Sequence, residues 1–115
     1  MSKAEDINGG KIFVSKAVGF PQAFLKLAVD KLNDKLGASV IVLVSVVKAD
    51  KLGICVKVSD EFVKKGINAG KIVAEIAEAT GGKGGGRPNF AQGGGKDESK
   101  LDDVLLKIKN DLKNV

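Results

Sequence analysis

The ten residues ASVIVLVSVV, at positions 38–47, constrain the fold of this 115-residue chain more than any other segment. The run lacks the polar–apolar alternation of a half-exposed strand, so it predicts a central strand that is covered on both faces. It is too short to cross a bilayer as a helix, which needs about 20 apolar residues. A strand covered on both faces favours a sheet with helices packed against it.

Two further strands are expected beside this run. KIFVSKAV, at 11–18, contains the β-branched residues that strands prefer. LGICVKVS, at 52–59, places alternate apolar residues on one face, and the polar segment 48–51 is short enough for a hairpin turn. The residues expected on that face are Leu52, Ile54, Val56 and Val58.

Three main helices are expected to pack on the sheet. The first lies between Pro21 and Gly37, a residue pair typical of a helix start and stop. A turn or short helix is expected within 60–70, and the second main helix begins near Asn68. The third follows Asp97 as its cap. Their apolar faces are Leu25, Ala28, Leu32 and Leu36; Ala69, Ile72, Val73, Ile76 and Ala77; and Leu101, Val104, Leu105, Ile108 and Leu112.

The predicted fold class is therefore α/β: a compact single domain with a mixed sheet, three main helices and a Gly-rich loop before the C-terminal helix. We expect the globular domain to span 10–115. Residues 1–9 are polar and are expected to form a disordered lead, with Met1 added for expression.

Composition excludes several classes of function. The chain has no His, which argues against zinc sites and against Ser-His or Cys-His catalysis. Its one Cys, Cys55, cannot form an intramolecular disulfide and lies in an apolar run, as expected of a buried residue in a cytoplasmic protein. No signal peptide is visible. The net charge of +5 suits an anionic partner such as nucleic acid, and it also suits simple solubility.

The most densely basic segment is GGKGGGRPNFAQGGGK, at 81–96, with three positive charges and no negative one. It fits neither the P-loop pattern, because Asp97 follows GGGK, nor the dinucleotide pattern, because Arg87 stands where the last Gly is needed. An apolar-faced helix on either side makes it an internal loop rather than a linker between domains. RPNFAQ within it is a candidate short edge strand.

This loop is the candidate nucleic-acid site. Gly84, Gly85 and Gly86 let a phosphate approach backbone N–H groups, and the basic side chains add charge. Phe90 either stacks on a base or anchors the loop in the core. Arg87 either contacts nucleic acid or forms a salt bridge with Glu75, Glu78 or Asp97. The remaining candidates are Lys83 and Lys96 for charge, and Asn89 and Gln92 for hydrogen bonds. Other lysine surfaces are alternatives: Lys26, Lys31 and Lys35, or Lys64 and Lys65.

Residues 67–105 resemble the C-terminal end of bacterial-type alanyl-tRNA synthetases. That family ends in a helix beginning near N/DAG, a Gly-rich loop, an RPD-M/F-AQ-GG-KD pattern and a final helix. Asn89 stands where Asp is common in the family. DHH-associated relatives often carry His where this chain has Arg87, which favours the synthetase version.

The resemblance implies a C-Ala domain with no catalytic activity of its own. It implies binding to the elbow of alanine tRNA, which helps aminoacylation and editing act on the same tRNA. Similarity to the DHH-associated domain also implies binding to single-stranded nucleic acid. The partners in cis would be the upstream catalytic and editing domains. ATP, Mg and Zn would bind to those domains, and no cofactor is expected in this domain. No membrane is expected among its partners. Two alternatives stay open: a docking or dimerisation module of the synthetase, and the accessory domain of a DHH-type phosphoesterase or editing protein.

Overall fold

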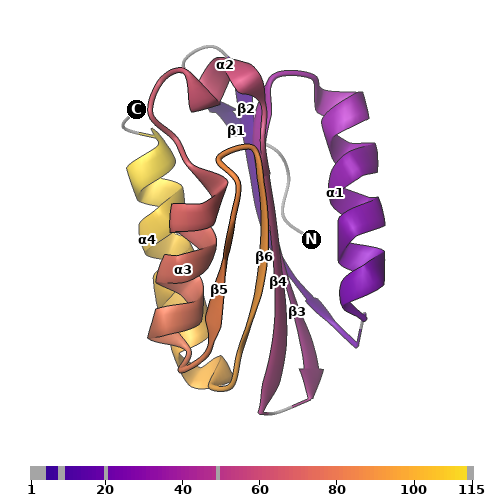
Figure 1. The fold of residues 1–115 in the computed structure, drawn as a ribbon, viewed down its shortest axis with the longest axis vertical. Coiled ribbons are helices and arrows are strands. Elements are labelled where there is room, and N and C mark those ends of the chain that lie inside the picture. The colour runs from indigo at the N-terminus through magenta and orange to yellow at the C-terminus, as the bar shows by residue number, and fades with distance from the viewer. Residues whose placement is uncertain (1–4, 8–9, 20, 49, 114–115) are drawn as a thin grey trace.

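The chain folds into a six-stranded sheet with helices on both faces (Figure 1). The computed structural model describes residues 5–7, 10–19, 21–48 and 50–113. The strands are β1 (Glu5–Ile7), β2 (Gly10–Val18), β3 (Ser39–Lys48), β4 (Lys51–Val58), β5 (Lys83–Gly86) and β6 (Phe90–Gly95). The helices are α1 (Gln22–Leu36), α2 (Asp60–Val63), α3 (Ala69–Ala79) and α4 (Leu101–Lys113), with one short 3-10 turn, η1 (Glu98–Lys100), before α4.

The strand order across the sheet is β1-β2-β3-β4-β6-β5. β2 and β3 are parallel, because α1 carries the chain back across one face between them, and every other neighbouring pair is antiparallel. This mixed sheet confirms the predicted α/β class.

The core is built around β3, in which every residue from Ser39 to Val46 is buried. Val40 and Val42 belong to a large cluster with α3 and α4, whereas Ile41 and Leu43 belong to a smaller cluster with α1. Figure 1 shows α1 on one side of the sheet and α3 with α4 on the other. The prediction of a strand covered on both faces is confirmed.

Helix boundaries and buried faces also follow the predicted signals. α1 ends at Gly37, whose φ of 71° lies in the region that favours glycine, and Pro21 occupies the N-cap. Asn68 caps α3 by accepting a hydrogen bond from the Lys71 N–H at 3.1 Å. The expected apolar faces of α3 and α4 are buried. None of the helices in the described part of the chain is long and apolar enough to cross a membrane.

Two expectations differ from the structure. Residues 81–96 form a β-hairpin rather than a loop: β5 is the outer strand, Pro88 and Asn89 make the turn, and β6 lies between β4 and β5. Phe90 and Gln92 therefore lie in an internal strand, not in an edge strand.

The N-terminal segment also differs from the expectation of a disordered lead. Glu5–Ile7 form β1, which pairs with β2, and residues 1–4 and 8–9 lie outside the described part of the chain. Asp97 caps η1, which leads directly into α4.

The glycines of the hairpin allow α3 to pack very close to it. A Cβ atom on Gly84 would lie 2.6 Å from Val73 Cγ1, and one on Gly93 would lie 2.7 Å from the same atom. At the start of α3, a Cβ on Gly70 would lie 2.8 Å from the Gly86 carbonyl oxygen. Real Cβ contacts are essentially never this short, so the absence of side chains on both surfaces sets the helix-to-hairpin distance.

This packing predicts a large difference between two neighbouring substitutions. Gly93→Ala forces its new methyl group into Val73, and we expect a loss of about 1–3 kcal/mol in the free energy of unfolding. Gly85→Ala is the matched control, since nothing lies within 4 Å of its Cβ position, and it should change stability by no more than about 0.5 kcal/mol. Urea denaturation measures both values. Equal effects would contradict the proposed role of the glycines.

Candidate nucleic-acid interface

The structure places six of the predicted site residues in two grooves at opposite ends of β6. Lys83, Gln92 and Lys96 line a groove where β6 ends, and Arg87, Asn89 and Phe90 line another at the hairpin turn. A strand of this length separates its two ends by roughly 17 Å. The segment 81–96 therefore does not form one continuous phosphate cradle.

We call the first of these the basic groove. It has a volume of about 880 Å³, a floor that includes Gly93, Gly94 and Gly95, and a single acid, Asp50, among the described residues that line it. Its four lysines are Lys48, Lys51, Lys83 and Lys96. All four are exposed, and none forms an ion pair with a described residue. Unpaired lysines around a concave surface create a positive potential that attracts anions.

The β4–β6 pairing brings these lysines together from distant parts of the sequence. Leu52 pairs with Gly95, which puts the β3–β4 turn beside the end of β6, and Lys83 of β5 pairs with Gly94. The sequence prediction missed Lys48 and Lys51 as site residues and placed both in the turn of a hairpin. In the structure they are the last residue of β3 and the first residue of β4, and they pair with each other. The missing information was which strand lies beside β4.

Three backbone N–H groups beside the basic groove already donate to carbonyl oxygens. The Gly82 N–H donates to the Ala77 carbonyl at 2.7 Å, and the Lys96 and Asp97 N–H groups both donate to the Thr80 carbonyl. Lysine side chains are therefore the main source of attraction for an anion there.

The predicted backbone donors Gly84, Gly85 and Gly86 lie in β5. Arg87 N–H donates to the Phe90 carbonyl at 2.9 Å, and hydrogen-bonded pairs alternate along an antiparallel ladder. Gly85 therefore pairs inward with Gln92, whereas Gly84 and Gly86 direct their N–H groups to the open edge of the sheet.

The second groove, which we call the turn groove, lies between α1 and the start of β6 and has a volume of about 670 Å³. Its charges balance: Lys26, Lys57 and Arg87 against Asp30, Asp60 and Glu61. Phe90 is half-buried against the α1 cluster, with Lys26 Nζ 5.8 Å from its ring centroid. The ring thus anchors the hairpin and also lines the groove.

Arg87 does not form the salt bridges that were considered from the sequence. It is exposed and has no ion pair with a described residue, whereas Glu75 pairs with Lys107 at 2.6 Å. That contact also raises the pKa of Lys107, through a hydrogen bond and the charge of the carboxylate. The guanidinium of Arg87 is therefore available to a ligand.

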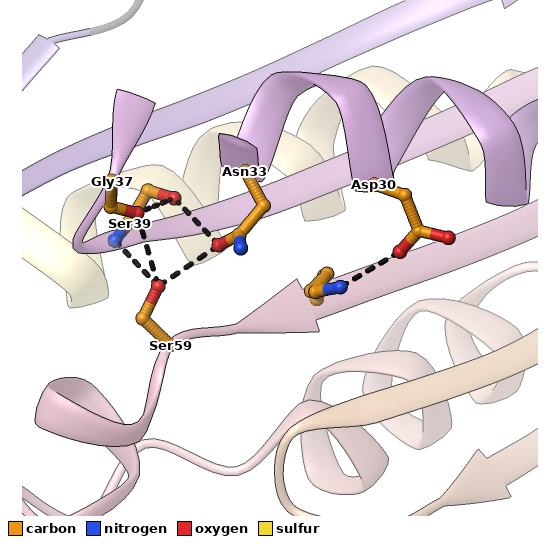
Figure 2. Close-up of polar contacts among 6 residues, drawn as sticks. Asp30, Asn33, Gly37, Ser39 and Ser59 are labelled. Atoms are coloured by element: carbon orange, nitrogen blue, oxygen red, sulfur yellow. Dashed lines mark hydrogen bonds and ion pairs between the residues drawn. The ribbon is translucent and has the colours of Figure 1, made fainter. Parts of the chain in front are cut away.

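Asn33, Gly37 and Ser59, which line the turn groove, belong to a polar network with Ser39 (Figure 2). Ser59 Oγ accepts a hydrogen bond from the buried Ser39 N–H at 2.9 Å and donates to Asn33 Oδ1 at 3.0 Å. Next to this network, Lys57 Nζ contacts Asp30 Oδ1 at 2.7 Å. These contacts tie the C-terminal half of α1 to β4 and fix the groove wall on which Asp30 and Asn33 lie.

Cys55 takes no part in either groove. It is fully buried in the cluster beneath α1, and burial raises the pKa of its thiol to about 12. The thiol is therefore neutral at physiological pH. A neutral, buried thiol is neither a nucleophile nor a metal ligand.

Comparison with known families identifies the fold. The sequence matches the DHHA1 domain over residues 9–114. The chain belongs to the DHHA1 domain family. Among curated relatives of this DHHA1 domain, alanine–tRNA ligase of Nostoc punctiforme is 45% identical over 114 residues, covering 99% of the chain and 13% of the ligase. The Bacillus subtilis enzyme is 39% identical over 115 residues, covering 100% and 13%.

Solved structures agree with this assignment. The C-Ala domain from Aquifex aeolicus alanyl-tRNA synthetase matches with a TM-score of 0.83 and 28% identity, over 96% of this chain and 98% of that one. A DHH-domain protein described as a member of a family of ribosomal proteins matches at 0.63 with 23% identity, over 97% and 28%, and shows the shared fold alone. The resemblance to C-Ala domains is confirmed, and the chain spans about an eighth of its curated relatives.

The serine network predicts a measurable contribution to stability. Ser59→Ala leaves the buried Ser39 N–H without its acceptor, so we expect unfolding to become easier by about 1–3 kcal/mol. Ser15→Ala, on a half-exposed stretch of β2, is the matched control and should shift stability by less than about 0.5 kcal/mol. Thermal and urea unfolding provide the comparison. A Ser59 effect no larger than that of Ser15 would show that the network is dispensable.

Proposed function

We propose that this DHHA1 domain is a tRNA-binding accessory domain of an alanyl-tRNA synthetase, without catalytic activity or a cofactor of its own. The observation that carries the proposal is the basic groove, where Lys48, Lys51, Lys83 and Lys96 surround a glycine floor. Together with Asp50, these side chains give the groove a net charge of +3. The names of the relatives supply the class of anion, since they are alanine–tRNA ligases.

The shape and chemistry of the groove suit an RNA backbone. Gly94 adds no side chain to the floor of the groove, and the Cβ positions of Gly93 and Gly95 face α3 and Thr80 instead. The lysines supply the charge, because the N–H groups of Gly82, Lys96 and Asp97 are used. None of the described residues that line the basic groove is aromatic, so these residues offer no stacking platform of the kind typical of single-strand binding. We therefore expect it to bind the backbone of folded RNA, with little dependence on sequence.

The turn groove would provide a second contact to the same RNA. Arg87 and Asn89 are exposed at the hairpin turn, and Arg87 suits bidentate contact with phosphate. An RNA that touches both grooves must present two contact points roughly 17 Å apart. We propose that this RNA is the elbow of alanine tRNA, bound in the cytoplasm, and that binding holds it for aminoacylation and editing by other domains of the polypeptide.

Removal of the four groove lysines tests the proposal. In wild type, the logarithm of the tRNA binding constant should fall with the logarithm of salt concentration with a slope of about −2 to −4. Replacing Lys48, Lys51, Lys83 and Lys96 with Ala should remove most of this slope and weaken binding at least tenfold at low salt.

The matched control removes the same charge elsewhere, through Ala at Lys31, Lys35, Lys64 and Lys65. It should retain most of the wild-type affinity and slope. The experiment also tests those lysines as the alternative surface. If the two quadruple variants bind alike, or if the control loses more, the basic groove is not the RNA site.

The acid Asp50 in the groove predicts a gain in binding. Asp50→Asn removes the carboxylate that repels phosphate, and we expect tRNA affinity to rise about two- to fivefold at low salt and less at high salt. Asp34→Asn, on the exposed surface of α1, makes the same change in charge and should alter affinity by less than about twofold. Titration by fluorescence anisotropy distinguishes the two. A fall in affinity for Asp50→Asn would contradict the placement of RNA beside the β3–β4 turn.

A further inference from the structure

The C-terminal end of α3 lies beside the end of β6 (Figure 1), and Thr80 joins the two. Thr80 is the C-cap residue of α3 and is fully buried. Its carbonyl oxygen accepts two hydrogen bonds, from the Lys96 N–H at 2.8 Å and from the Asp97 N–H at 2.9 Å. We call these contacts the Thr80 junction. They attach the segment between β6 and η1 directly to the end of α3.

The turn after α3 explains why the Thr80 carbonyl takes its donors from another part of the chain. The Gly82 N–H donates to the Ala77 carbonyl at 2.7 Å and the Gly81 N–H donates to the Glu78 carbonyl at 3.3 Å, with a φ of 77° at Gly81. This pattern is the Schellman motif, which satisfies the carbonyl groups of the last helical turn from within the turn itself. The Thr80 carbonyl instead receives its donors from the segment after β6.

The side chain of Thr80 sets how closely the end of β6 approaches. Thr80 Oγ1 donates to the Ile76 carbonyl at 2.8 Å, which fixes the orientation of the hydroxyl group. A Cβ atom on Gly95 would collide with that Oγ1 and would lie 2.8 Å from Thr80 Cβ. The backbone of Gly95 therefore lies directly against the Thr80 side chain. Lys96, the next residue, is held by this contact as well as by its own hydrogen bond.

The Thr80 junction acts on the charge of the basic groove in two ways. It holds the backbone of Lys96, one of the four exposed lysines that line the groove. It also supplies donors to a carbonyl at the C-terminal end of α3, where a helix carries partial negative charge. Without those donors, an unsatisfied acceptor would lie beside a site for an anion.

We propose that Thr80 is a positioning residue for RNA binding: it holds the backbone at Lys96 so that the lysine side chain reaches RNA in the basic groove. Thr80 is buried, so it contributes to binding through Lys96 and not by touching RNA. The proposal rests on the proposed RNA binding at the basic groove and adds to it a residue that lies beneath the surface.

Salt-dependent tRNA binding tests the proposal. Lys96→Ala should make the log–log salt slope shallower by about 0.7–0.9, the effect of one phosphate contact, and weaken binding about two- to fourfold at low salt. Thr80→Val replaces the hydroxyl group with a methyl group that presses on Gly95 and cannot bond to the Ile76 carbonyl. We expect it to cause about half or more of the same change in slope. Thr80→Ser keeps Oγ1 and should retain the wild-type slope.

Double variants separate positioning from general destabilisation. Thr80→Val combined with Lys96→Ala should have the same slope as Lys96→Ala alone, because Thr80 acts through Lys96. Leu112→Ala is the stability control, since it removes a buried side chain of α4 that is not among the described residues lining either groove. It should lower the free energy of unfolding in urea and leave the slope unchanged. Its effect on affinity should simply add to that of Lys96→Ala.

Gly95→Ala drives a methyl group into the same contact from the β6 side and gives an independent test if Thr80→Val fails to fold. Wild-type slopes for Thr80→Val and Gly95→Ala, with a shallower slope for Lys96→Ala, would overturn the positioning role and leave the RNA groove standing. Losses that add in the double variant would also overturn it. A wild-type slope for Lys96→Ala would instead remove Lys96 from the RNA site, and the positioning role would fail with it.

Discussion

The close approach of α3 to the glycine hairpin is the contact on which the rest of the structure depends. Gly84 and Gly93 meet the Val73 side chain at distances that leave no room for a methyl group. This contact holds β5 and β6 against the helix, and β6 in turn pairs with β4. The position of the hairpin determines both grooves, because one lies at each end of β6.

The amino-acid pattern was sufficient to predict most of the architecture. β3 was recognisable because its apolar run shows no alternation, and α3 and α4 were recognisable because their apolar residues recur with helical spacing. The hairpin was not predicted because a strand is recognised by the alternation of its side chains, and Gly84, Gly85 and Gly86 have none. Its strand structure comes from pairing and from the helix above it, neither of which is local in sequence.

The candidate site was predicted only in part, for a related reason. Lys83 and Lys96 were found because they lie inside a conspicuous basic segment. Lys48 and Lys51 join them only because β4 pairs with β6, a contact between segments far apart in the chain. The extended conformation of β5 separates Arg87 from Lys83, although the two residues are near in sequence. Sequence proximity was therefore a poor guide to which residues share a groove.

The pairing of the first long strand with the last helix has a consequence for how the domain acquires its structure. Lys16 of β2 contacts Asp102 of α4 at 3.0 Å, across 86 positions of the chain, and the α4 side chains complete the larger of the two clusters. A ribosome releases these residues in order, so the early strands must wait with one apolar face exposed until α4 emerges. The larger cluster is therefore complete only when the final helix is present.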